Sequence, residues 1–230
     1  MNITFGIITA GNNDHMLSES INSIHALNIP KYEIIVVGGT QHIGPNVTNI
    51  PFDESVKHAW VTKKKNLITE HASFDNIVYA HDFIYFDNNW YNGFLSHGDD
   101  FNVCMNVILN ADGSRFRDWT LWTDNGNHAD AVTNPELKCL LPYNVINLSK
   151  FMYISGSYWV AKKKIMEEYP LNEELSWAEG EDVEWSKLVR EKHEFSMNPN
   201  STVRLLKYKP VYYQTIPESD LNIIYKGIKC

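Results

Sequence analysis

Short apolar runs alternate with amphipathic segments through the first hundred residues. The runs at 3–9, 32–37 and 77–80 have the length and composition of buried strands, and helical patterns at 17–27 and 57–72 separate them. Strands that alternate with helices in this way form a largely parallel sheet. The sequence therefore predicts an α/β fold in which helices flank a mostly parallel central sheet.

The third of these runs ends in polar residues that no buried strand needs. Ile77–Ala80 leads directly into His81 and Asp82. Ligands of open α/β sheets bind at the carboxyl ends of the strands. His81 and Asp82 are therefore the first candidates for a site. A strand-to-loop turn with no ligand is the alternative.

Composition narrows the possible partners and location. The 230 residues carry a net charge of −8 at pH 7, which excludes a general affinity for the nucleic-acid backbone. No stretch reaches the roughly 20 apolar residues of a transmembrane segment, and Met1–Phe5 lacks the features of a signal peptide. The thiols of Cys104, Cys139 and Cys230 have no metal-ligand spacing. We expect a single cytoplasmic domain over 1–230, without nucleic-acid partners.

A second group of polar residues occurs about a hundred residues later. The segment Trp177–Trp185 contains Glu179, Glu181, Asp182 and Glu184 at the expected start of a helix. Acidic residues at two distant places in the sequence of one α/β fold suggest a metal-assisted transfer site. Acidic residues also suit the first turn of any helix, which is the structural alternative.

Several segments, in their order along the chain, resemble one enzyme family. The strand, polar turn and helix at the start are followed by Glu33–Gly39, Lys65–Leu67, Ile77–Asp82, Ser155–Ser157 and Glu181–Asp182. Over roughly residues 1–210 this order resembles the glycosyltransferases of the A-type fold, in particular those similar to family 2. The resemblance implies a Rossmann-like sheet, with a nucleotide-binding half at 1–100 and an acceptor and catalytic half at 101–230.

The resemblance also implies an activity. The protein would move a sugar from a nucleotide-diphosphate sugar, expected to be a UDP-sugar, to a hydroxyl of a glycan or glycoconjugate acceptor. Inversion at the anomeric carbon is expected, with Asp182 as the catalytic base and Glu181 as its partner. The residues expected to contact the donor are Thr9, Ala10, Gly11, Gly38, Lys65, His81, Asp82, Arg115 and Gly156.

The family's metal motif is altered in this chain. An Asp-x-Asp sequence normally holds a divalent cation on the diphosphate, and here it reads His81-Asp82-Phe83. We expect Asp82 to bind Mn²⁺ or Mg²⁺ while His81 contacts the ribose. The alternatives are that His81 binds the metal, or that no cation is used. Leu206–Lys209 stands where the family often has a further histidine ligand, and a lysine there could neutralise the diphosphate directly.

Other charged and aromatic segments allow two interpretations each. Among Lys63–Lys65, at most two side chains of a helix can face a cleft, and the resemblance selects Lys65. Arg115 and Asp118 either contact the donor sugar or form a structural ion pair. Most of the later aromatic residues should lie in the core, with one or two touching ligand: Trp119, Trp122, Tyr158, Trp159 and Trp177.

Two other functions remain open from the sequence. A catalytically silent nucleotide- or glycan-binding module would explain Phe83, and also Gly38, which stands where relatives often have an aspartate. The pair Glu181–Asp182 argues against it, because a pure binder needs no base. A sugar nucleotidyltransferase is a weaker alternative, since its first turn carries a catalytic arginine and Thr9–Asn13 contains none.

Overall fold

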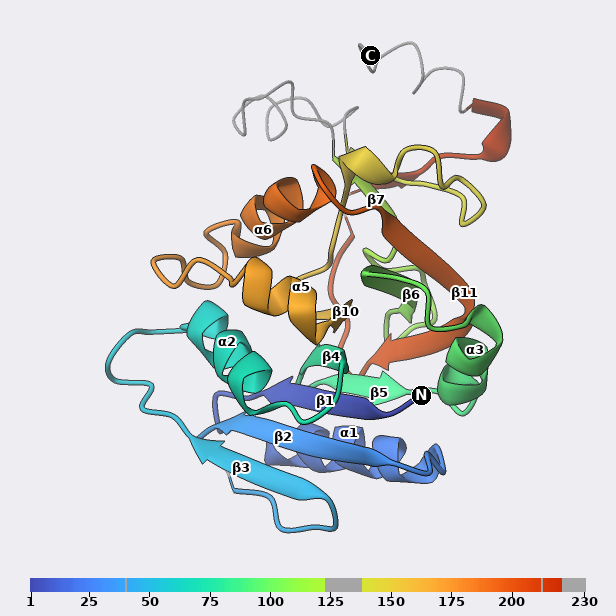
Figure 1. Ribbon diagram of the computed structural model, residues 1–230. Helices are drawn as coiled ribbons and strands as arrows, with labels where there is room; N and C mark the ends of the chain where they lie inside the picture. Colours follow the sequence, from blue (N-terminus) through green and yellow to red (C-terminus); the bar gives the residue numbers. More distant parts are fainter. Residues whose placement is uncertain (40, 123–137, 212, 221–230) are drawn as a thin grey trace.

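An eight-stranded sheet forms the centre of the computed structural model, which describes residues 1–39, 41–122, 138–211 and 213–220 (Figure 1). In spatial order its strands are β3 (Val47–Pro51), β2 (Tyr32–Gly38), β1 (Ile3–Ile8), β4 (Asn76–His81), β10 (Tyr158–Lys162), β6 (Val103–Leu109), β11 (Phe195–Leu205) and β5 (Ile84–Phe86). The expected loop at 110–134 lies partly outside the described residues, and its described part contains β7 (Thr120–Trp122).

The first four strands, β1 to β4, run parallel, as their alternation with helices predicts. Ile3 pairs with Tyr32 on one side and with Asn76 on the other, so the first residues of β1, β2 and β4 lie side by side. At the other end of the same register, Ile8 pairs with Val37 and His81. The residues that follow β1, β2 and β4 therefore emerge at one edge of the sheet.

The strand β10 joins the two halves of the sheet. It runs antiparallel to β4 and to β6, whereas β6 and β11 are parallel to each other. The sequence pattern predicts one strand near 152–160, but β9 (Met152–Tyr153) and β10 are separated by a turn at 155–157. The turn is fixed against the end of β4, because the backbone N–H of His81 donates to Ser157 O over 3.1 Å.

Helices cover both faces of the parallel strands. α2 (Val61–His71) packs on the face to which Gly6 belongs, where a Cβ on that glycine would lie 2.2 Å from Ile68 Cγ2. α1 (Asp14–Ala26) packs on the other face beside β5, and Ser23 Oγ accepts the Phe86 N–H over 3.0 Å. The other helices of the described ranges are α3 (Trp90–His97), α5 (Lys163–Glu168) and α6 (Glu181–Arg190), with short 3-10 turns at Ser149–Phe151 and Glu218–Asp220.

The helix α2 is shorter than expected, and it buries polar side chains. It begins at Val61 instead of near residue 57. Besides the apolar Ile68 it buries Lys64, Lys65 and Asn66, whereas Leu67 is only half-buried. A helix that buries two lysines is packed against polar partners and not only against the core.

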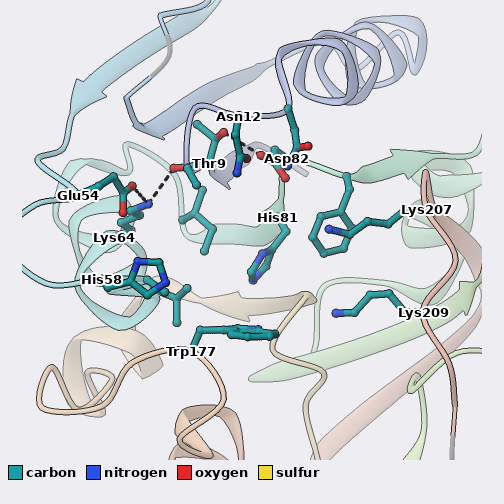
Figure 2. A pocket seen from close by; sticks show the side chains of 16 residues that line it. Thr9, Asn12, Glu54, His58, Lys64, His81, Asp82, Trp177, Lys207 and Lys209 are labelled. Atoms are coloured by element: carbon teal, nitrogen blue, oxygen red, sulfur yellow. Dashed lines mark hydrogen bonds and ion pairs between the residues drawn. The ribbon is translucent and has the colours of Figure 1, made fainter.

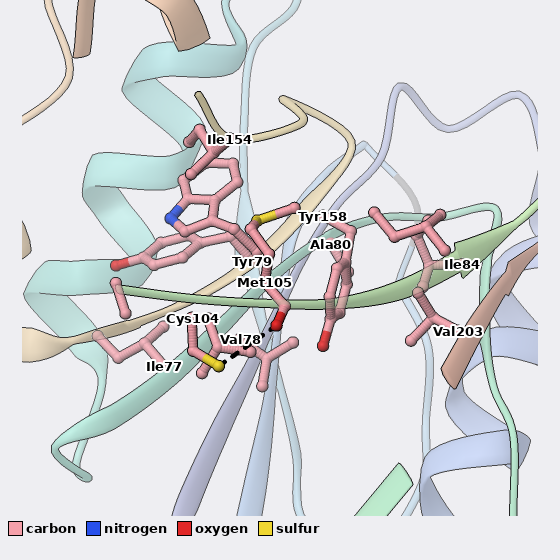
Figure 3. Packing of buried hydrophobic residues seen from close by; sticks show 14 of the residues in the cluster. Ile77, Val78, Tyr79, Ala80, Ile84, Cys104, Met105, Ile154, Tyr158 and Val203 are labelled. Carbon is pink, nitrogen blue, oxygen red and sulfur yellow. Dashed lines mark hydrogen bonds between the residues drawn. The ribbon is translucent and has the colours of Figure 1, made fainter. Parts of the chain in front are cut away.

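Large aromatic side chains pack in the core where β4, β10 and β6 meet (Figure 3). Tyr79 of β4 stacks on Trp159 of β10 with ring centroids 4.7 Å apart. Tyr158 accepts a hydrogen bond from Trp90 Nε1 over 2.8 Å and donates to the buried Asn106. These contacts fix β10 between the two halves of the sheet and so hold the turn at 155–157 in place.

A smaller sheet lies outside the main one. Its order is β12 (Gln214–Thr215), β8 (Lys138–Leu140), β7 and β9. Within the described part of the chain, none of the helices has the length and apolar character needed to cross a membrane.

Candidate functional site

A cavity of about 460 Å³ opens at the carboxyl ends of β1 and β4 (Figure 2). The chain after β1 forms one wall, α2 and the loop before it form another, and the segment after β11 closes the far side. We call it the first cavity. The residues that line it are Ile8, Thr9, Ala10, Asn12, Asn13, Glu54, His58, Ala59, Val61, Lys64, His81, Asp82, Phe83, Trp177, Lys207 and Lys209.

Asp82 is held firmly at the base of this cavity. Its Oδ2 accepts a hydrogen bond from Thr9 Oγ1 over 2.8 Å, and Thr9 Oγ1 in turn accepts the Gly11 N–H over 3.0 Å. Asp82 is only 4% exposed. Burial raises the pKa of this carboxyl, and the hydrogen bond from Thr9 and the charge of Lys207 oppose that rise. The register of β1 and β4 thus brings two predicted site residues, Thr9 and Asp82, into contact.

His81 is surrounded by positive charge. Burial and then the charges of Lys65, Lys209, Lys207 and Lys64 hold the pKa of its imidazole well below its ordinary value. His81 is therefore neutral at physiological pH, and it contributes a hydrogen-bonding ring without a charge.

Two lysines lie over the aromatic ring that replaces the family's last aspartate. Lys207 Nζ is 4.0 Å from the centroid of the Phe83 ring, and Lys209 Nζ is 5.2 Å from it. Lys209 Nζ also donates to Ser157 Oγ over 3.1 Å. Burial, with the charges of Arg117 and Lys207, lowers the pKa of Lys209 to about 8.

A second cavity of about 430 Å³ adjoins the first and shares His81, Trp177 and Lys209 with it. The predicted catalytic residues Glu181 and Asp182 line this second cavity. Its other residues are Arg117, Trp122, Ser155, Gly156, Ser157, Ala178, Glu179, Gly180, Val183 and Tyr213.

The position of the Asp182 carboxylate depends on the turn before β10. Asp182 Oδ2 accepts the Gly156 N–H over 2.9 Å, and Oδ1 accepts the Val183 N–H over 2.9 Å. A Cβ at position 156 would lie 2.9 Å from the same Oδ2, so glycine is needed for this close approach. Burial and the charge of Asp182 raise the pKa of Glu181, and the charge of Lys65 opposes that rise.

Lys65 does not line either cavity. It is buried under Trp159, with Nζ 4.6 Å from that ring's centroid, and it donates to Gly156 O over 2.9 Å. Its neighbour Lys64 lines the first cavity, donating to Thr9 O over 2.8 Å and pairing with Glu54. Side chains at neighbouring helix positions point about 100° apart. The sequence pattern did not predict the orientation of α2 precisely enough to decide whether Lys64 or Lys65 faces the first cavity.

Three other residues expected to contact the donor, Gly11, Arg115 and Gly38, line neither cavity. Arg115 Nε is 2.7 Å from Oδ1 of the buried Asp118, and Arg115 Nη2 donates to Leu141 O over 2.7 Å. The structural ion pair is therefore the interpretation that the structure favours for Arg115, whereas Arg117 reaches the second cavity. Gly38 lines a separate small cavity beside Asn49 and Phe52.

The aromatic residues divide as expected. Trp119, Tyr158 and Trp159 are buried in the core. Trp122 lines the second cavity, and Trp177, which is 58% exposed, lines both. An exposed indole at the shared wall is available for stacking on a ring of a ligand.

The described side chains around Asp82 fit a divalent cation poorly. Within the described ranges, no group of three His, Cys, Asp or Glu side chains could hold a metal ion. Mg²⁺ and Mn²⁺ prefer several oxygen ligands, whereas Asp82 supplies one carboxylate next to Lys64 and Lys207. Phe83 offers no ligand atom where the family has its final aspartate. The charged groups beside Asp82 are thus ammonium groups, which attract anions and repel metal cations.

Comparison with known proteins gives matches in structure only. No protein-family model matches the sequence, and no curated protein matches it. A solved structure of GalNAc-T7 with UDP, GalNAc and Mn²⁺ is similar with a TM-score of 0.66 and 13% identity, over 94% of this chain and 45% of that one. Staphylococcus aureus TarS 1–349 with UDP-GlcNAc gives 0.57 and 13%, over 92% and 60%.

A further structure, S. aureus TarS 1–349 in complex with UDP, gives a TM-score of 0.54 and 14% identity, over 97% of this chain and 63% of that one. The chain thus spans less than two thirds of the length of these neighbours. GalNAc-T7 and TarS are both glycosyltransferases with A-type folds. The likeness confirms the predicted fold: the chain has the α/β fold of the A-type glycosyltransferases.

Proposed function

We propose that the protein transfers a sugar from a nucleotide-diphosphate sugar, a UDP-sugar, to a hydroxyl of a glycan or glycoconjugate. The observation that carries this proposal is the pair of adjoining cavities, which share His81, Trp177 and Lys209. The first cavity holds Thr9, Ala10 and Asp82, and the second holds the carboxylates. The UDP and UDP-GlcNAc bound in the TarS structures support this donor class.

The arrangement supports one placement of the substrates. The nucleotide occupies the first cavity, between the chain after β1 and α2, and its diphosphate faces Lys207 and Lys209. The anomeric carbon then lies at the wall shared by the two cavities, near His81 and Trp177. The acceptor enters through the second cavity, where Trp177 and Tyr213 provide aromatic surface for a sugar ring.

Asp182 is the base in this scheme. The acceptor oxygen forms a bond to the anomeric carbon while the bond from that carbon to the diphosphate oxygen breaks. The electron pair of the broken bond leaves with the diphosphate, and the acceptor proton passes to Asp182. Attack from the side opposite the leaving group inverts the anomeric carbon. Hydrogen bonds from Gly156 and Val183 orient the carboxylate before the acceptor arrives.

A catalytically silent binding module is the second candidate, favoured by Phe83 and by the poor metal donor set. Such a module would bind the nucleotide sugar in the first cavity without needing Glu181 and Asp182 in the second. Retention of both carboxylates in one cavity supports the enzyme.

A screen of nucleotide sugars tests the proposal and separates the two candidates. Thermal unfolding should show a true donor, since a ligand at a hundredfold excess over Kd stabilises the protein by about 2.7 kcal/mol. The stabilising donor is then incubated with the protein, and release of the free nucleoside diphosphate is measured. Release supports the enzyme, and stabilisation without any release over a panel of glycan acceptors favours the binding module. If no nucleotide sugar stabilises the protein, both are wrong.

A further inference from the structure

We propose that Lys207 and Lys209, held against the ring of Phe83, neutralise the donor diphosphate in place of a divalent cation. This inference rests on the proposed function and concerns the same first cavity. It predicts that donor binding and transfer proceed without metal, through the chain's own ammonium groups.

The argument begins with Phe83, which both removes a metal ligand and positions the lysines. Its ring is buried, with only 4% of the residue exposed. The two ammonium groups lie 4.0 and 5.2 Å from the ring centroid, within the distance at which a cation is attracted to an aromatic face. The aspartate that would bind a cation is thus replaced by a side chain that holds two ammonium groups of the protein itself. Lys207 and Lys209 both line the first cavity (Figure 2).

The backbone that carries the lysines is fixed at both ends. Leu206 N–H donates to Phe83 O over 2.8 Å. Further along, the buried Asn110 accepts the Lys209 N–H and donates to Lys209 O, each over 2.9 Å. The lysines therefore need little reorganisation to meet a ligand, which lowers the entropy cost of binding.

Within the described residues, neither Lys207 nor Lys209 forms an ion pair with a carboxylate. Lys209 faces the positive charges of Arg117, Lys207 and Lys65 together with the negative charge of Asp182. Like charges gathered at the edge of a cavity favour an anion strongly, and they would repel Mn²⁺ or Mg²⁺ from Asp82.

A diphosphate fits this surplus of charge. As the bond to the sugar breaks, negative charge grows on the phosphate oxygen that was bonded to the anomeric carbon. Ammonium groups fixed beside the diphosphate therefore stabilise the transition state more than the ground state. A bound divalent cation would supply the same stabilisation in the family's usual arrangement.

Isothermal titration calorimetry with UDP and with inorganic pyrophosphate, each in EDTA and in Mn²⁺, tests the proposal. The parent protein should bind UDP equally well under both conditions. The double variant Lys207→Gln/Lys209→Gln should lose about tenfold to a hundredfold in affinity for both probes, as expected for hydrogen bonds to charged groups. Lys207→Arg/Lys209→Arg should retain most of it, which also controls for folding. Lys164→Gln, an exposed lysine away from the first cavity, removes a matched charge and should have no effect.

The possible failures are distinct. Binding of UDP that requires Mn²⁺, or binding that the glutamine double variant leaves unchanged, would overturn the lysine proposal and leave the proposed function standing. Failure of UDP, GDP, ADP, CDP and pyrophosphate alike to bind under either condition would overturn both. Tight pyrophosphate binding without nucleotide binding would support the lysine site and contradict the nucleotide-sugar function.

Discussion

The two cavities that meet at His81 share a wall but differ in charge. The first contains three lysines and two carboxylates, and the second contains three carboxylates with Arg117 and Lys209: Lys64, Lys207, Lys209, Glu54 and Asp82 line the first, and Glu179, Glu181 and Asp182 line the second. Lys209 lines both and stands at the boundary. A transfer reaction needs this separation, because negative charge accumulates on the leaving group while a proton must leave the attacking hydroxyl. Under the proposed function, donor binding and turnover should therefore respond to different substitutions.

The largest expected effect comes from replacing the carboxylate of Asp182 in the second cavity. Asp182→Asn should lower turnover by about 10²- to 10⁴-fold with little change in donor affinity, because the amide cannot take the acceptor proton. Glu184→Gln is the matched control, since Glu184 lies in the same helical turn but lines neither cavity. Near-parental turnover of Asp182→Asn on its acceptor would show that the acidic cluster only serves the helix terminus.

A glycine substitution tests whether the position of that carboxylate matters. Gly156→Ala would place a methyl group 2.9 Å from Asp182 Oδ2, so the carboxylate must move. A displacement of about 1 Å can cost up to about a hundredfold in rate. We expect a loss of that order in turnover and little loss in donor affinity. Gly39→Ala, which meets nothing within 4 Å, is the control. Equal turnover in both variants would remove Gly156 from the account.

The pH dependence of donor binding tests the role of Lys209 in the first cavity. Lys209 has a pKa of about 8 and faces Arg117, Lys207, Lys65 and Asp182. Since the anion binds the protonated amine, affinity should be full below pH 8 and fall above it, by at most about tenfold per pH unit. His81 stays neutral throughout this range and adds no transition. Calorimetry from pH 6.5 to 9.5 should show the fall, and Lys209→Gln should flatten it. A flat parent profile contradicts the assignment.

The smallest effect concerns the buried lysine behind the second cavity. The charge of Lys65 opposes the rise in the pKa of Glu181. Lys65→Met should therefore raise that pKa further and move the acid limb of the turnover profile to higher pH. Lys63→Met, at a half-buried position on the same helix, is the control. An acid limb that stays in place, with only a lower melting temperature, would show that Lys65 acts in folding alone.

The sequence was most informative where local pattern and sheet geometry agree. Apolar runs separated by helices predicted β1, β2 and β4, and the polar end of the β4 run predicted a site at His81 and Asp82, where the structure also brings Thr9 into contact with Asp82. The start of α6 was also predicted, because a dense acidic cluster marks a helix N-terminus.

The remaining features depend on contacts between distant segments. The side chains of Lys64 and Lys65 differ by one helical step, and tertiary packing alone decided which of them faces the first cavity. Arg115 was assigned to the donor, but its partner Asp118 is buried three residues away. The place of Lys207 and Lys209 over Phe83 required β11 to return beside β5, a pairing that spans more than a hundred residues.

Donor Kd and kcat measured side by side in EDTA, for the parent, Asp182→Asn and Lys207→Gln/Lys209→Gln, test the central claim most directly. The account predicts that the parent turns over without metal. It also predicts that Asp182→Asn lowers kcat at an unchanged Kd, and that the double lysine variant weakens Kd by about tenfold or more. Loss of all parental activity in EDTA, or an unchanged Kd in the lysine variant, would contradict it.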